Sequence, residues 1–409
     1  MKFDDYKISD ELKESIRKLG FKRPTDIQFK SIQPILSGDD VLAIAQTGTG
    51  KTAAFAIPII DLLHYHKLNQ RRNDGIRAIV MVPTRELAIQ ITEVFNALEQ
   101  GTTVRTFGVF GGVDQDPQIA ELQKGFDILV ATPGRLFDLV SQGYLQLHRI
   151  QYLILDEADH MLALGFIKDI RQLITFLPKK RQTLFFSATI DKEIKKLAYS
   201  LVTNPIRIQI SPNDPVSKNV NHKVAFVEMD DKRFFLERLI KENPESKILV
   251  FVRTKVRAER VAKAMERAEI AAKTIHGDKE QKDRSHVMNE FKKGEIKVLI
   301  ATDVSARGID VDRVEFVVNY DLPDQAENYV HRVGRTGRGD HRGFAISFCA
   351  KEEMPLLEAI EDYIGKPVYV NEISKDDYVT TKELSEENPA DWKSLMQKPL
   401  PIKKKKKRK

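Results

Sequence analysis

Three carboxylates stand together directly after an apolar stretch in the segment LILDEADHML, residues 153–162. Asp156, Glu157 and Asp159 follow a run of the kind that forms buried strands. Like charges gathered at a strand end are unfavourable unless a cation or ordered water shares the site with them. A solvated acidic turn is the alternative for a pair of adjacent acids. The apolar run before the cluster favours a site that holds a cation.

A glycine-rich segment, AQTGTGKT, occupies residues 45–52 between a strand-like run and a helix-like pattern. That context is the one a phosphate-binding loop requires. Gly48 and Gly50 let backbone N–H groups approach phosphates, and the start of the helix adds its positive end. Lys51 would meet the β- and γ-phosphates, and the Thr52 hydroxyl would ligate Mg²⁺. An ordinary glycine-rich turn is the alternative.

The two motifs together indicate which cation the carboxylates need. Asp156 can hold a Mg²⁺ ion that bridges the phosphates of ATP, and Glu157 can orient or deprotonate the attacking water. In GFKRPTDIQ, residues 20–28, the Gln28 amide can both donate to and accept from adenine. Phe21, and more weakly Phe3, can stack on the base. The start of an amphipathic helix would look much the same, so that alternative stays open.

The elements that position these motifs are apolar runs alternating with amphipathic helix patterns. Most runs are continuous rather than alternating, which predicts strands buried on both faces of a parallel sheet. The strands expected in the first half are residues 41–45, 76–82, 104–110, 127–131, 152–156 and 183–188. A Pro- and Asn-containing break follows at residues 210–221, and the alternation then resumes. We therefore expect an α/β fold of two doubly wound domains with ligands at the carboxyl ends of the strands.

Composition limits the class of protein. The 409 residues are 42% hydrophobic and 31% charged, as expected for two buried cores with a polar surface. The net charge of +7 equals the basic run at residues 403–409, so the rest of the chain is formally neutral. A single cysteine, Cys349, excludes an intramolecular disulfide and a multi-cysteine zinc site. The charged N-terminus and the lack of a stretch of about 20 apolar residues predict a cytoplasmic protein without membrane contact.

Ten short motifs stand in one order along the chain and resemble those of the DEAD-box RNA helicases, ATP-dependent members of helicase superfamily 2. They are GFKRPTDIQ, AQTGTGKT, PTREL (83–87), GG (111–112), TPGR (132–135), DEAD (156–159), SAT (187–189), ILVFVRT (248–254), ATDVSARGID (301–310) and HRVGRTGR (331–338). The resemblance covers nearly all of residues 3–365. The amino-acid sequence of the motifs is most similar to that of the bacterial RhlE-type branch. The resemblance implies two tandem RecA-like domains, at residues 1–209 and 221–372. The Pro- and Asn-containing break predicts a flexible linker at 210–220, and the loss of periodicity before the final basic run predicts a disordered basic tail at 373–409.

The resemblance also implies a role for each motif. The residues that would bind the nucleotide are Phe21, Gln28, Gln46, Thr47, Gly48, Thr49, Gly50, Lys51, Thr52 and Asp303, the last near the ribose. The catalytic residues would be Lys51, Asp156 and Glu157, with Arg335 and Arg338 as arginine fingers, and the Mg²⁺ ligands Thr52 and Asp156. The residues that would couple hydrolysis to strand separation are Asp159, Ser187, Thr189 and His331. The RNA contacts would be Pro83, Thr84, Arg85, Gly111, Gly112, Thr132, Pro133, Gly134, Arg135, Arg253, Thr254 and Thr302.

The second half has no GKT loop, so its expected contribution is the arginine-rich motif at residues 331–338, with Arg335 and Arg338 on one helix face. We expect RNA-stimulated ATP hydrolysis that waits for domain closure and unwinds short duplexes through contacts without sequence preference. The basic tail would act as an RNA tether. The expected partners are RNA and ribonucleoprotein assembly factors, including those of ribosomes, or degradation factors, with the chain as a monomer.

Three other functions are alternatives to this one. An ATP-gated RNA clamp that serves as an assembly scaffold is the main alternative. A DNA-directed helicase is disfavoured only by the resemblance. A dehydrogenase is disfavoured because the phosphate loop is of the GKT type and lacks G-x-G-x-x-G.

Overall fold

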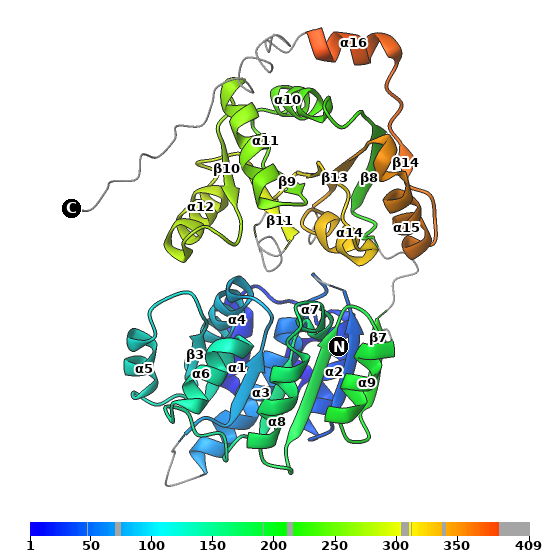
Figure 1. Ribbon diagram of the computed structural model, residues 1–409. Helices are drawn as coiled ribbons and strands as arrows, with labels where there is room; N and C mark the ends of the chain where they lie inside the picture. Colours follow the sequence, from blue (N-terminus) through cyan, green and yellow to red (C-terminus); the bar gives the residue numbers. More distant parts are fainter. Residues whose placement is uncertain are drawn as a thin grey trace, which may run out of the picture.

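The computed structural model describes residues 1–46, 48–69, 75–190, 192–210, 216–303, 311, 313–337 and 341–383, apart from the side chain of Gln281. Two α/β domains follow one another along the chain and face each other (Figure 1). Each domain is built on a seven-stranded sheet, and every strand pairing among the described residues is parallel. The expected α/β fold of two doubly wound domains is confirmed.

The first sheet has the strand order β3-β4-β2-β5-β6-β1-β7. Its strands are β1 (Val41–Ala45), β2 (Ala78–Met81), β3 (Thr106–Val109), β4 (Ile128–Ala131), β5 (Tyr152–Leu155), β6 (Gln182–Ser187) and β7 (Ile206–Ile210). The helices of this domain are η1 (Phe3–Asp5), α1 (Asp10–Lys18), α2 (Asp26–Leu36), α3 (Lys51–Leu68), α4 (Arg85–Leu98), α5 (Asp116–Leu122), α6 (Pro133–Ser141), α7 (Ala158–Ala163), α8 (Ile167–Phe176) and α9 (Lys192–Leu201).

The second sheet repeats this order as β10-β11-β9-β12-β13-β8-β14. Its strands are β8 (Val220–Phe226), β9 (Ile248–Val252), β10 (Ala272–Ile275), β11 (Val298–Thr302), β12 (Phe316–Asn319), β13 (Gly343–Cys349) and β14 (Tyr369–Val370). The helices are α10 (Lys232–Glu242), α11 (Lys255–Arg267), α12 (Gln281–Lys293), α14 (Ala326–Val333), η2 (Lys351–Glu353), α15 (Met354–Ile364) and α16 (Lys375–Glu383).

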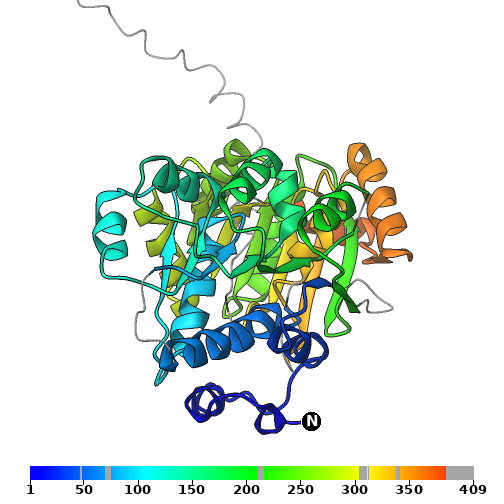
Figure 2. The same ribbon diagram turned by 90° about the horizontal axis from the view of Figure 1, so that it is seen from below.

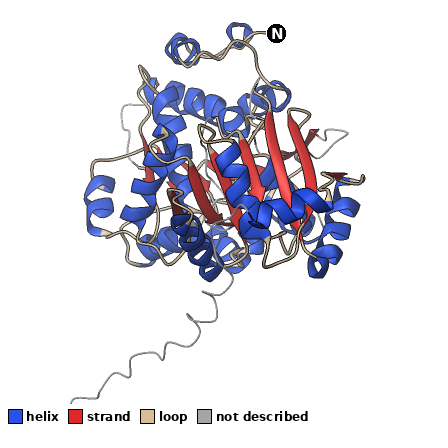
Figure 3. Ribbon diagram, turned by 90° about the horizontal axis from the view of Figure 1, so that it is seen from above, coloured by secondary structure: helices blue, strands red, loops and turns tan. Residues whose placement is uncertain are grey.

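Helices cover both faces of each sheet, as the continuous apolar runs require (Figure 3). Alternate residues of one strand enter opposite cores: Ala43 packs with α2, α3 and α4, whereas Leu42 packs with α8 and α9. Figure 2 shows η1 and α1 on the outside of the first domain, where Leu12 and Ile16 are fully buried. This layering leaves the carboxyl ends of the strands open for the motifs.

Three strands were not expected from the sequence: β7, β13 and the two-residue edge strand β14, which is too short and too exposed to give an apolar run. The edge strand β7 was missed because it exposes Ile206 and Arg207, so it lacks the continuous apolar run of a central strand. Strand β13 was missed because it begins at Gly343, directly after the arginine-rich motif, where we expected no element. Strand β7 pairs with β1, and β13 lies between β12 and β8.

The expected linker and tail need correction. Ile210 lies in β7 and Val220 in β8, and Val216 is buried in a core of the second domain, so the linker is shorter than residues 210–220. The tail was expected from residue 373, but α16 packs on α10. The Phe235 and Tyr378 rings lie 4.9 Å apart. This helix is held by one aromatic ring and by polar contacts, so its sequence has no apolar periodicity to detect. Residues 384–409, with the basic run, lie outside the described residues.

No helix among the described residues is both long and apolar enough to cross a bilayer.

Candidate active site

The phosphate-loop motif joins the end of β1 to the start of α3. Gly48 and Gly50 have φ values of 81° and 90°, in the left-handed region that favours glycine. A Cβ atom on Gly50 would lie 2.5 Å from the Gln28 Nε2 atom, so a larger residue there would displace that amide. The Thr49 hydroxyl donates to the Gln46 carbonyl at 2.8 Å and closes the turn. Thr47 lies outside the described residues.

Gln28 connects the start of α2 to this loop. Its Oε1 atom accepts a hydrogen bond from the Thr25 N–H at 3.0 Å, and its Nε2 atom donates to the Gly50 carbonyl at 3.1 Å. The amide therefore both donates and accepts, but to the backbone, and its contact with adenine stays a prediction. Phe21 is half-buried against the first core, with its ring 6.2 Å from that of Phe3.

The acidic cluster lies where β5 ends, next to the phosphate loop. Asp156 is buried, and its Oδ1 atom lies 4.0 Å from the Lys51 Nζ atom. The Lys51 ammonium is buried as well and makes no hydrogen bond within the described part of the chain. Burial raises the pKa of Asp156 to about 6, because the neighbouring charges of Glu157 and Asp159 add to the desolvation and Lys51 only partly offsets it. The site is thus short of positive charge.

Glu157 has the opposite electrostatic environment. Burial raises its pKa, but the hydrogen bond and charge of His160, together with the charges of Lys51 and His331, outweigh burial and hold the pKa well below its usual range. The His160 Nδ1 atom lies 3.5 Å from the Glu157 Oε2 atom. His160 was not predicted from the sequence, although its place three residues after Glu157 on a helix was a usable signal. The lowered pKa keeps this carboxylate charged at neutral pH, so it can accept a hydrogen bond from a water and orient it.

These pKa shifts predict opposite effects of two neutralising substitutions on the nucleotide-free protein. Between about pH 4 and 6 the folded state binds more protons at Asp156 than the unfolded state does, so stability falls as pH rises through 6. Asp156→Asn should therefore stabilise the fold at pH 7.5 by about 1–3 kcal/mol. Glu157→Gln should destabilise it, because the lowered pKa of that carboxyl contributes stability at every pH above its ordinary value. Thermal unfolding without nucleotide measures the stability of both variants. A destabilised Asp156→Asn variant would contradict the raised pKa of Asp156.

Asp159 joins the acidic motif to the SAT motif. Its Oδ2 atom accepts hydrogen bonds from the backbone N–H groups of Ala188 and Thr189, at 3.1 and 3.0 Å. The Thr189 hydroxyl donates to the same oxygen at 3.3 Å. The Ser187 hydroxyl is fully buried beside them and has no hydrogen-bond partner among the described residues. The structure therefore brings together three of the four residues to which the resemblance gives a coupling role.

The fourth, His331, comes from the second domain. A cavity of about 310 Å³ lies between the domains and is lined by Asp159, Thr189, Asn328 and His331. The histidine is close enough to lower the pKa of Glu157. Charged groups of both domains therefore act on one catalytic candidate.

The arginine-rich motif differs from the expected geometry. Helix α14 ends at Val333 with Gly334 as its C-cap, so Arg335 lies in the following turn and not in the helix. The Arg335 Nε atom donates to the His331 carbonyl at 3.1 Å, and the side chain is buried. The expectation of helical spacing was wrong because glycines interrupt the motif. Arg338 lies outside the described residues.

Arg332 anchors Asp303. Its Nε and Nη2 atoms donate to the two carboxylate oxygens at 2.5 and 2.7 Å, and its guanidinium lies 5.1 Å from the Phe251 ring centroid. Arg332 is 1% exposed, so this pair is built into the second domain. Sequence analysis proposed Asp303 for the ribose and did not foresee its partner, since 29 residues separate the two.

The RNA candidates of the first domain gather at helix starts. Thr84 is the N-cap of α4 and accepts from the Leu87 N–H at 3.3 Å, and Thr132 is the N-cap of α6, followed by Pro133. Gly112 has a φ of 76°, and a Cβ there would lie 1.7 Å from the Arg85 guanidinium. Helix starts and open glycines suit phosphate binding without sequence preference.

The other candidates of this set are placed as follows. Nothing described lies within 4 Å of a Cβ built on Gly111 or Gly134, so backbone can approach there. The Arg135 Nη2 atom donates to the Val113 carbonyl at 2.8 Å. Pro83 is buried between β2 and α4.

In the second domain the candidates lie at the ends of β9 and β11. Thr254 caps α11 and accepts from the Arg257 N–H at 3.1 Å, and Thr302 ends β11. The Arg253 guanidinium lies 3.0 Å from Asp324 and 3.1 Å from Glu353. Arg253 therefore has acidic partners within its own domain.

Comparisons with known proteins assign the family. The family model described as DEAD/DEAH box helicase matches residues 25–197, and the model described as helicase conserved C-terminal domain matches residues 231–340. The ATP-dependent RNA helicase RhlB of Shewanella amazonensis is 40% identical over 378 residues, which are 92% of this chain and 86% of that protein. The chain belongs to the DEAD-box family of ATP-dependent RNA helicases.

Further relatives support the assignment of this chain to the DEAD-box helicases. The ATP-dependent RNA helicase DbpA of Bacillus subtilis is 38% identical over 93% of this chain and 78% of its own length. The solved structure of S. cerevisiae Dbp5 bound to RNA and ADP BeF3 has a TM-score of 0.82 at 30% identity, covering 94% of this chain and 98% of that chain. Mss116p bound to ssRNA and AMP-PNP has a TM-score of 0.84 at 28% identity, covering 97% and 84%.

The two domains of the helicase also meet through an ion pair that the sequence did not predict. The Arg284 Nη2 atom on α12 lies 2.6 Å from the Glu86 Oε1 atom on α4, and the side chains are only 8% and 12% exposed. The two residues are far apart in the sequence, so nothing local to either of them pointed to the pair. The pair holds the carboxyl-end edges of the two sheets together.

Proposed function

We propose that this helicase hydrolyses Mg-ATP at the seam between its domains when RNA draws them together, and that the closed form separates short RNA duplexes. The carrying observation is the charge environment of Glu157, which Lys51 of the first domain and His331 of the second both affect. The cross-domain pair of Glu86 and Arg284 supports the same arrangement. The high TM-scores against RNA- and nucleotide-bound relatives support it further.

The nucleotide site fits ATP with Mg²⁺. The buried Lys51 ammonium has no hydrogen-bond partner among the described residues and suits a phosphate oxygen. Asp156 and Thr52 would hold the metal ion. Its positive charge would favour the ionised form of Asp156, whose pKa is raised by burial and by neighbouring acids. No group of three or more His, Cys, Asp or Glu side chains in the described ranges is arranged to bind a metal alone. Phosphate oxygens and water would therefore complete the coordination.

Roles for the remaining site residues follow from their positions. Glu157 orients the attacking water. The state of the nucleotide is transmitted to the domain interface by four residues, Asp159, Ser187, Thr189 and His331. Arg335 serves as an arginine finger after a short rearrangement of its turn, and Arg338 is proposed as a second finger. Gln28 and Phe21 recognise adenine once the Gln28 amide exchanges a backbone partner for the base.

RNA would lie across the helix starts of both domains. The backbone N–H groups near Thr84, Thr132 and Thr254 point out of their helices and can bind phosphates. The Arg253 guanidinium, which has partners in Asp324 and Glu353, is better suited to supporting the Thr254 loop than to gripping a phosphate itself.

Single-turnover ATP hydrolysis with and without a short RNA distinguishes a helicase mechanism from an ATP-gated clamp. The proposal requires RNA to accelerate hydrolysis and strand separation to depend on ATP. RNA binding that depends on ATP, with hydrolysis as slow as without RNA, would favour the clamp.

The basic run at residues 403–409 is proposed as an RNA tether. Removing it should reduce the slope of log affinity against log salt by up to about 0.7 per lost phosphate contact and leave hydrolysis at saturating RNA unchanged. Titration of a labelled RNA from low to moderate salt measures the slope. Unchanged affinity at low salt after truncation would refute the tether.

We further propose a cytoplasmic monomer that works with ribonucleoprotein assembly or degradation factors. The RhlE-type branch stays a prediction from the motif wording, because the relatives named above are RhlB and DbpA proteins.

A further inference from the structure

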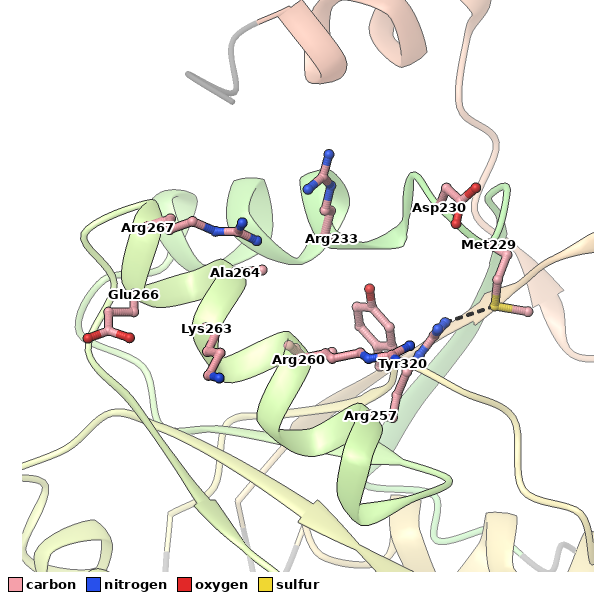
Figure 4. A pocket seen from close by; sticks show the side chains of 11 residues that line it. Met229, Asp230, Arg233, Arg257, Arg260, Lys263, Ala264, Glu266, Arg267 and Tyr320 are labelled. Carbon is pink, nitrogen blue, oxygen red and sulfur yellow. Dashed lines mark hydrogen bonds between the residues drawn. The ribbon is translucent and has the colours of Figure 1, made fainter. Parts of the chain in front are cut away.

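A large cavity lies between α10 and α11 of the second domain, on the face of the sheet that these helices cover (Figure 4). Its volume of about 980 Å³ is at the upper end of ligand-binding pockets. Its lining includes two carboxylates, Asp230 and Glu266, and a larger number of cations. The cations that line it are Arg233, Arg257, Arg260, Lys263 and Arg267. The excess of positive charge calls for an anionic occupant.

The cations of α11 are placed where a group from outside the folded domain can bind them. Arg260, Lys263 and Arg267 are exposed and share one helix face through their spacing of three and four residues. Arg260 and Lys263 make no hydrogen bond or ion pair with any side chain or backbone group that the structure describes. Arg257, by contrast, lies 3.3 Å from Asp321 and 5.4 Å from the Tyr320 ring centroid.

The cavity also has an apolar wall, formed by Met229, Val261, Ala264 and the ring of Tyr320. A nucleic-acid backbone would use the cations and leave this wall unused. An acidic peptide with one large apolar side chain would use both, because its carboxylates pair with the cations while the side chain buries apolar area. The chemistry of the cavity therefore favours an acidic peptide with an aromatic or aliphatic anchor.

The chain itself contains such a peptide. Residues 384–392 read LSEENPADW, with three acids, no basic residue and the only tryptophan of the protein at the end. We propose that residues 386–392 dock in this cavity, with Trp392 on the apolar wall and Glu386 and Glu387 paired with Arg260 and Lys263. The docked segment would hold the basic run at residues 403–409 beside the second domain.

The path of the chain makes this docking possible. Helix α16 packs on α10, and the Lys382 Nζ atom lies 3.0 Å from the Asp231 Oδ2 atom, one residue from the cavity-lining Asp230. Trp392 lies nine positions after Glu383, a stretch that spans up to about 30 Å when extended. The part of α11 that lines the cavity, from Arg257 to Arg267, is only about 15 Å long. The segment can therefore reach every lining residue.

The fluorescence of Trp392 tests the proposal in the full-length protein without a label, because no other tryptophan contributes. We expect emission at shorter wavelength and several-fold weaker acrylamide quenching than for a synthetic peptide of residues 384–393. The double variant Arg260→Glu/Lys263→Glu should shift both readouts to the peptide values. Adding Glu386→Lys/Glu387→Lys should restore them. The matched control Lys195→Glu/Lys196→Glu changes two exposed lysines of α9 and should have no effect.

Three outcomes would overturn the proposal. The first is peptide-like emission and quenching in the unaltered protein. The second is protection of Trp392 that survives Arg260→Glu/Lys263→Glu, which would place the segment elsewhere. The third is a loss of RNA affinity in that double variant with unchanged fluorescence, which would assign the cavity to RNA.

Discussion

Replacing Arg335 by alanine is expected to slow RNA-stimulated ATP hydrolysis about 10³–10⁵-fold while leaving ATP affinity near normal. This loss corresponds to about 4–7 kcal/mol of transition-state stabilisation. The reason is that an arginine finger acts on charge that develops at the γ-phosphate only in the transition state. Pre-steady-state hydrolysis and nucleotide titration measure the two quantities separately.

Two controls make the Arg335 prediction specific. Arg335→Lys keeps the positive charge but loses the forked guanidinium, so its rate should lie between those of the unaltered protein and the alanine variant. Arg342→Ala removes an exposed arginine before β13 and should leave the rate unchanged. Normal turnover by Arg335→Ala would remove Arg335 from the catalytic set.

Glu157→Gln is expected to reduce hydrolysis about 10²–10⁴-fold and to prolong the RNA-bound closed state. The amide keeps the size of the side chain, but the attacking water loses the carboxylate that orients it. ATP and RNA should still bind, because the predicted phosphate and metal contacts belong to Lys51, Thr52 and Asp156. The lifetime of the RNA complex after dilution, together with single-turnover hydrolysis, checks both parts.

A matched control uses an exposed glutamate. Glu121→Gln on α5 changes a side chain whose ionic partner is Lys124, so hydrolysis and RNA release should stay as in the unaltered protein. If Glu157→Gln hydrolysed ATP at the normal rate, or released RNA as fast as the unaltered protein, the role given to Glu157 would be wrong.

Several features were predictable because their signals are local in the sequence. Continuous apolar runs such as residues 41–45 and 152–155 identify strands buried on both faces, and the parallel sheets follow from them. The GKT loop and the DEAD cluster are also local, because the backbone conformation and the side chains that carry the chemistry lie within a few residues. The edge strand β7 and helix α16 were missed because their stability depends on neighbours rather than on their own pattern.

The sequence by itself determined the two-domain α/β architecture and the family, because these depend on residue types at short spacing. The tertiary structure alone decided which motifs meet. Asp159 reaches Thr189 across 30 residues, Arg332 holds Asp303 across 29, and Glu86 pairs with Arg284 of the other domain. It also decided that the pKa of Glu157 is lowered and that of Asp156 is raised, although the two residues are adjacent. Burial and distant charges set a pKa, and neither is encoded in the order of neighbouring residues.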